Sequence, residues 1–156
     1  MRDFQKLQAR KKRIPSKVAG PAEDLIHLKR DEQQVLGIGA SNEDEEVPYI
    51  ALKYFDRKYE CFSKWGPTEL KAFSSLVDKL KNVNWQQLKT QEGLGYTVHP
   101  NRNRLPNGGA ALEEISHEIS PFEIRVTGRA RLHGFRMKAA FFLVWLDKNH
   151  RIYPDR

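Results

Sequence analysis

The sequence has a single cysteine, Cys61, and no long apolar run. One cysteine excludes an intramolecular disulfide, and the opening residues MRDFQKLQARKKR lack the apolar stretch of a secretory signal. An intracellular, cytoplasmic protein is therefore expected. The most apolar stretch, AAFFLVWL at 139–146, is too short to cross a bilayer as a helix and is typical of a buried strand. No membrane role is predicted.

Motifs for cofactors and metals are also lacking. The segment GIGA at 37–40 has neither the third glycine nor the following helix that a dinucleotide-binding loop needs. The five histidines show no paired short spacing, and one cysteine cannot build a cysteine-rich zinc site. The sequence therefore predicts no cofactor and no metal.

Positive charge is what the chain does have, with 27 lysines and arginines against 20 acidic residues and a net charge of +7. Such a field attracts polyanions without specifying which one. The segment SNEDEE at 41–46, followed by Pro48, has the composition of a solvated linker. We therefore expect two parts: a basic extension over 1–46, with a short helix after Pro21 or disorder, and a main domain over 47–156.

The main domain begins with the pattern of a strand followed by two helices. VPYIALKYF at 47–55 is rich in β-branched and aromatic residues and predicts a strand. In WGPTELKAFSSLVDKL at 65–80, Gly66 caps a helix that Pro67 starts, and Leu70, Phe73, Val77 and Leu80 share one face. NWQQLKTQEG at 84–93 repeats the capping pattern. A long loop over 94–110, functional or mobile, and a short helix over 111–118 should follow.

The segment FEIRVTGRARLHGF at 122–135 is typical of a β-hairpin. A three-residue turn over 127–129, with Gly128 left-handed, sets Arg125 opposite Arg131 and Glu123 opposite His133, with apolar residues on the other face. Like charges directly opposite one another cost up to roughly 1 kcal/mol. Two interpretations stay open: a solvated outer face with spare arginines, or a site for an anionic ligand.

The order of strand, two-helix hairpin and three antiparallel strands resembles the RelE/ParE superfamily of toxin-antitoxin systems. The residues that carry the resemblance are WGPTELKAFSSLVDKL, FEIRVTGRARLHGFRMKAAFFLVWL and DKNHRIYP, within 47–154. The resemblance implies an α+β fold with an antiparallel meander. The family includes messenger-RNA endonucleases that act on the ribosome and gyrase poisons, so it narrows the fold more than the activity. The loop over 94–110 departs from the compact toxins of this family.

For the nucleases of that family, the resemblance implies metal-independent cleavage of RNA by the neighbouring ribose 2′-hydroxyl. Arg125 and Arg131 would then hold the phosphate, and His150 or His133 would transfer the proton. Residues expected to bind the nucleic acid are Arg129, Arg136, Lys138, Lys148, Arg151 and Tyr153. For three of these candidates a simpler role stays open. His150 could cap a turn, His133 could form a hydrogen bond to Glu123, and Tyr153 could pack as a core residue.

Three functions follow, in order of preference. The first is a RelE-like endoribonuclease acting on mRNA, free or ribosome-bound, and controlled by an acidic antitoxin or by the acidic block NEDEE at 42–46. The second is a non-catalytic nucleic-acid-binding or regulatory protein that uses the same basic face, with steep salt dependence and no cleavage. The third is an interaction protein whose arginines bind an acidic partner.

Overall fold

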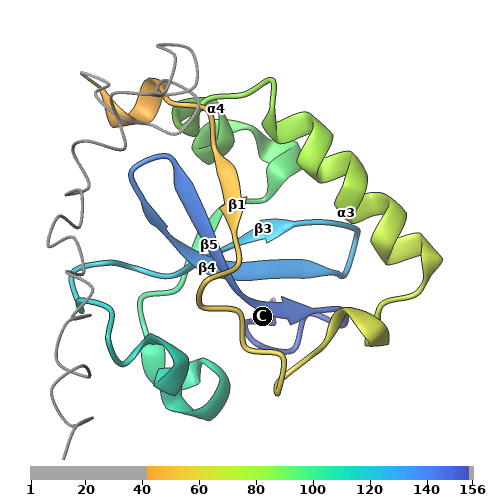
Figure 1. Cartoon of the computed structure of the whole chain (residues 1–156), viewed down its shortest axis with the longest axis vertical. Helices are drawn as coiled ribbons and strands as arrows, with labels where there is room; N and C mark the ends of the chain where they lie inside the picture. Colours follow the sequence, from red (N-terminus) through yellow and green to blue (C-terminus); the bar gives the residue numbers. More distant parts are fainter. Residues whose placement is uncertain (1–41, 155–156) are drawn as a thin grey trace, which may run out of the picture.

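The computed structural model describes residues 42–154, so the expected helix after Pro21 lies outside the described residues. Five strands form one mixed sheet in the order β1-β5-β4-β3-β2 (Figure 1). The strands are β1 (Tyr49–Ala51), β2 (Thr97–Val98), β3 (Phe122–Arg125), β4 (Arg131–Met137) and β5 (Ala140–Asp147). β1 is parallel to β5, and the other neighbours are antiparallel. The fold is α+β, as predicted.

The two helices begin where the capping signals place them. Helix α3 (Pro67–Leu80) starts after Gly66, whose backbone amide donates to Glu69 Oε2 at 2.8 Å. Helix α4 (Trp85–Thr90) starts with the reciprocal pair of Asn84 and Gln87. The predicted apolar face of α3 is wrong at its start, because Leu70 is 39% exposed whereas Leu76 is buried.

The β3–β4 hairpin has the predicted register, with Arg125 opposite Arg131 and Glu123 opposite His133. The prediction of a left-handed Gly128 is wrong, since the glycines with positive φ within residues 42–154 are Gly95, Gly108 and Gly109. Thr127 closes the turn instead, because its Oγ1 accepts from the backbone amides of Arg129 and Ala130. A local side-chain acceptor thus replaces the special glycine conformation.

Both faces of the sheet are covered. Helices α3 and α4 pack on one face, where Leu76, Trp85 and Leu88 meet Ile124 and Phe141. The opposite face is covered by the segment 99–119 together with the chain after β5 (Figure 1). Within this covering segment 3-10 helices occupy Arg102–Arg104 and Pro106–Leu112, and the α-helix expected over 111–118 is absent. The covering segment, predicted as a loop up to residue 110 and a short helix over 111–118, therefore forms one wall of the core.

Residues 42–46 of the acidic block pack on the domain and are not a solvated linker. They form a 3-10 helix at Glu43–Glu45, and Asp44 forms ion pairs with Lys89 and Arg136. The carbonyl oxygen of Glu46 accepts from the amide of Trp85 at 3.0 Å. No helix in residues 42–154 is long and apolar enough to cross a membrane.

Candidate functional site

The polar residues of the hairpin lie in a buried cluster beneath the covering segment. Glu123 of β3, Arg131 and His133 of β4, and Asp147 of β5 are all at most 4% exposed. His99, which follows β2, enters the cluster from the covering segment and is 1% exposed. The pleat therefore gathers charge on one face, as predicted, but that face is closed to solvent at these positions.

A chain of hydrogen bonds links Asp147, His133 and His99. His133 Nε2 lies 3.1 Å from Asp147 Oδ2, and His133 Nδ1 lies 2.9 Å from His99 Nε2. Burial alone would raise the pKa of Asp147, but the bond from His133 and two backbone amides keep that pKa below its ordinary value. Because Asp147 is then a carboxylate, which can only accept, the N–H at His133 Nε2 donates to Asp147 Oδ2.

His99 is held in its neutral form. Burial, reinforced by the neighbouring His133, His150 and Arg104, lowers the pKa of His99 to about 3. Its ring stacks on Tyr153 with the two ring centres 4.1 Å apart. At neutral pH the imidazole is therefore uncharged and fixed in orientation.

Glu123 uses its two carboxylate oxygens differently. Oε1 accepts from Arg131 Nε at 3.3 Å and lies 3.2 Å from His150 Nε2. Oε2 is buried without a hydrogen bond and faces His99 Nε2 at 3.5 Å and His133 Nδ1 at 3.8 Å. His99, Glu123 and His133 thus turn three metal-ligand atoms toward one point, each within 4.8 Å of the others.

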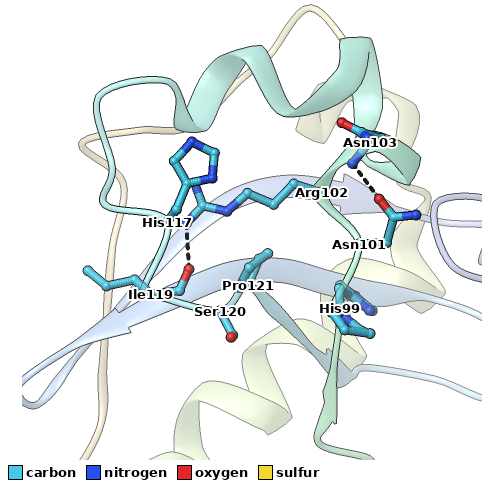
Figure 2. Close-up of a pocket in the computed structure, with 9 residues that line it drawn as sticks. His99, Asn101, Arg102, Asn103, His117, Ile119, Ser120 and Pro121 are labelled. Carbon is cyan, nitrogen blue, oxygen red and sulfur yellow. Dashed lines mark hydrogen bonds between the residues drawn. The ribbon is translucent and has the colours of Figure 1, made fainter.

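A cavity of about 370 Å³ adjoins His99 (Figure 2). Its walls are 99–103 and 117–121, two stretches at the ends of the covering segment. Arg102 holds these stretches together, because its guanidinium donates to the carbonyl oxygens of Ile115, Ser116 and Ile119. The guanidinium of Arg102 is therefore occupied by hydrogen bonds within the cavity wall. His117, which also lines the cavity, is exposed.

Two of the predicted catalytic residues are engaged inside the protein. Arg131 is 4% exposed, and its Nη1 donates to the carbonyl oxygens of Thr127, Gly128 and Ala130. His133 is fully buried between His99 and Asp147. The expectation that these two side chains face RNA is wrong for this arrangement, because neither reaches solvent.

The basic surface predicted to continue along the sheet is divided between its two ends. Arg136 and Lys138 lie at the β4–β5 turn, whereas Lys148 and Arg151 follow the far end of β5. Arg136 binds Asp44 at 2.6 Å, and Lys138 is exposed. Asp44 thus neutralises Arg136 at the β4–β5 end of the sheet.

The side chains of Tyr153 and Lys148 also contact other residues of the protein. The ring of Tyr153 meets His99 at 4.1 Å and the guanidinium of Arg104 at 4.2 Å, and its hydroxyl donates to the carbonyl oxygen of Asn101. Lys148 Nζ lies 3.6 Å from a carboxylate oxygen of Glu69. Tyr153 therefore packs as a core residue with both ring faces covered, rather than as an open stacking platform.

Three of the predicted arginines are exposed and have no ion pair in the described part of the chain: Arg125, Arg129 and Arg151, here called the rim arginines. Arg125 ends β3, Arg129 lies in the hairpin turn, and Arg151 donates its backbone amide to Asp147. Because Arg125, Arg131 and Asp147 are neighbours across the sheet, the rim arginines share one sheet end.

His150 precedes Arg151 with φ 53°, a left-handed conformation that is uncommon outside glycine, and its side chain is 10% exposed. It is the most accessible of the histidines that contact the cluster.

Comparison of the chain with protein-family models, with curated proteins and with solved structures finds no match. The function is therefore inferred from the geometry and chemistry of the chain itself. That geometry offers a buried donor cluster and, next to it, an exposed basic rim.

Proposed function

We propose that the protein binds single-stranded RNA through the rim arginines. The observation that carries this proposal is that Arg125, Arg129 and Arg151 are exposed at one sheet end and make no ion pair within residues 42–154. A guanidinium can grip two phosphate oxygens at once, which makes arginine suited to a flexible anionic chain. The net charge of +7 favours the encounter.

The salt dependence of binding follows from the number of phosphates contacted. For single strands, log K falls with log salt by about 0.7 for each neutralised phosphate. Three rim arginines that each contact one phosphate give a slope of about −2 by the same rule. Removing one arginine should therefore lower the steepness of the slope by about 0.7.

The test is fluorescence anisotropy of a labelled single-stranded RNA over a range of salt concentrations. Arg125→Ala, Arg129→Ala and Arg151→Ala should each weaken binding and flatten the slope, for RNAs of different sequence alike. Lys138→Ala is the matched control, because Lys138 is equally exposed but lies at the opposite sheet end. Equal losses in the control and the three variants would contradict a site at the rim.

A second candidate function is cleavage of the bound RNA, as the resemblance to RelE-type toxins implies. What favours it is His150, which lies beside Arg151 in a left-handed backbone conformation and contacts Glu123. In this proposal His150 takes the proton of the ribose 2′-hydroxyl as the 2′-oxygen attacks the adjacent phosphorus, and the 5′-oxygen leaves and takes a proton from solvent. Arg151 and Arg125 would stabilise the charge that grows on the phosphate.

Cleavage is tested by gel analysis of RNA incubated with the full chain, with and without translating ribosomes. His150→Gln and Arg151→Ala should each abolish cut products while the far-UV circular dichroism spectrum stays unchanged. If the wild-type protein binds RNA but yields no product in either format, cleavage is refuted and the non-catalytic binding function stands.

An acidic protein segment is the natural competitor for the rim arginines. Asp44 already neutralises Arg136 within the chain, at 2.6 Å. An acidic antitoxin-like partner would bind the rim in the same way and release the RNA. A glutamate-rich peptide should then displace labelled RNA, whereas a protein that binds the peptide and no RNA in any format would be an interaction protein instead.

A further inference from the structure

We propose that His99, Glu123 and His133 bind a divalent transition-metal ion of the zinc type. The donor atoms are His99 Nε2, His133 Nδ1 and Glu123 Oε2, which come from the covering segment, β4 and β3. Two imidazoles and one carboxylate are a donor set typical of Zn²⁺ and its first-row neighbours, whereas Ca²⁺ and Mg²⁺ prefer oxygen donors. This inference goes beyond RNA binding.

The spacing of the three donor atoms fits a metal ion. They are separated by 2.9 Å (His99 to His133), 3.5 Å (His99 to Glu123) and 3.8 Å (His133 to Glu123). A point equidistant from all three lies about 2.0 Å from each, which matches the bond lengths of about 2.0–2.2 Å that zinc makes with histidine nitrogen and carboxylate oxygen. An ion at or just above this point lies within bonding distance of all three donor atoms.

One donor, His133, is backed by the kind of group that metal sites use. A metal-bound histidine normally gives its other ring N–H to a carboxylate, and His133 Nε2 lies 3.1 Å from Asp147 Oδ2. Asp147 is in turn fixed by the backbone amides of Arg151 and Ile152. Arg131 holds Oε1 of Glu123, which directs Oε2 toward the two histidines.

Glu123 Oε2 is the independent observation that points to a ligand. It is a buried carboxylate oxygen with no hydrogen bond, which is rare in folded proteins and calls for an unseen partner. The cluster of Glu123, Asp147 and Arg131 holds two carboxylates against one guanidinium, so it can accommodate a further positive charge.

The ion would have a structural role. Its ligands are buried, and they tie the covering segment, through His99, to the two strands of the hairpin. Loss of the ion should therefore loosen the covering segment over the sheet face without removing the rim arginines. Metal binding and RNA binding can accordingly fail or succeed separately.

The first test uses the wild-type full chain, stripped with a chelator and titrated with Zn²⁺ and with Co²⁺. We expect one ion per chain with a submicromolar Kd, a visible absorption band for Co²⁺, and a Tm raised by several degrees. Nitrogen NMR of the Zn²⁺-loaded protein should show ligation through Nε2 of His99 and Nδ1 of His133. A folded wild-type chain that binds neither ion would overturn the proposal.

The second test uses variants. His99→Ala and Glu123→Gln should each weaken Zn²⁺ binding at least a hundredfold, and Glu123→Gln keeps an acceptor for Arg131. His117→Ala is the matched control, since His117 is an exposed histidine on the adjoining cavity and outside the donor set. Unchanged affinity in a folded Glu123→Gln protein overturns the site. If a variant fails to fold, the ring-nitrogen NMR signals of the Zn²⁺-loaded wild-type chain decide whether His99 and His133 are ligands.

Discussion

Replacing Arg131 by methionine tests whether this arginine is a buried structural residue or a phosphate-binding one. Methionine keeps most of the volume of the side chain but leaves Glu123, which is 4% exposed, without its guanidinium. Removing one partner of a buried ion pair costs about 3–5 kcal/mol. The carbonyl oxygens of Thr127, Gly128 and Ala130 lose a donor as well. We expect Arg131→Met to lower the free energy of unfolding by about 4 kcal/mol.

The assay is urea unfolding followed by tryptophan fluorescence. With a slope of about 2 kcal/mol per molar urea, a loss of about 4 kcal/mol moves the midpoint down by about 2 M. Arg125→Met is the matched control, because Arg125 lies opposite Arg131 but is exposed, and its change should stay within about 0.5 kcal/mol. If both variants unfold like the wild type, Arg131 is not the buried partner of Glu123.

Two further predictions concern packing and acid stability. A Cβ on Gly134 would clash with the carbonyl oxygen of Phe142, so Gly134→Ala should cost about 1–3 kcal/mol in urea unfolding, whereas Gly128→Ala, with open space around it, should be nearly neutral. Asp44 has its pKa lowered below 3.8 by Lys89 and Arg136, so its stabilisation is present at neutral pH and lost as the pH falls below 3.8. Asp44→Asn should therefore lower stability slightly at pH 7 and make no difference at pH 2; an equal effect at both would refute the pairing.

The register of the hairpin was predictable because the alternation of apolar and charged residues permits only one way to sort the faces. Burial of the charged face was not predictable in the same way. The segment that covers it carries glycine, proline and asparagine without helical or strand periodicity, so it was expected as a loop. The parallel pairing of β1 with β5 also joins segments about ninety residues apart that share no local signal.

The donor cluster escaped the sequence argument for a related reason. The absence of a metal was predicted because the histidines show no short paired spacing and the chain has one cysteine, whereas His99 and His133 come together although they are 34 residues apart. The only local signal was the expected pairing of Glu123 with His133 across the hairpin, which the structure confirms. His99 joins that pair because the backbone amide of His99 donates to the carbonyl oxygen of Pro121 and anchors the covering segment beside β3. Sites assembled across a sheet in this way need tertiary structure.

The central claim is that RNA binds the rim arginines, whereas the charged residues beneath the covering segment stay buried and do not contact RNA. A titration of the isotopically labelled protein with single-stranded RNA, followed through the arginine Nε–H signals, tests it most directly. We predict shifts for Arg125, Arg129 and Arg151 and none for Arg131, whose Nε–H is held by Glu123. A shift of the Arg131 signal while the rim arginines stay unchanged would contradict the account.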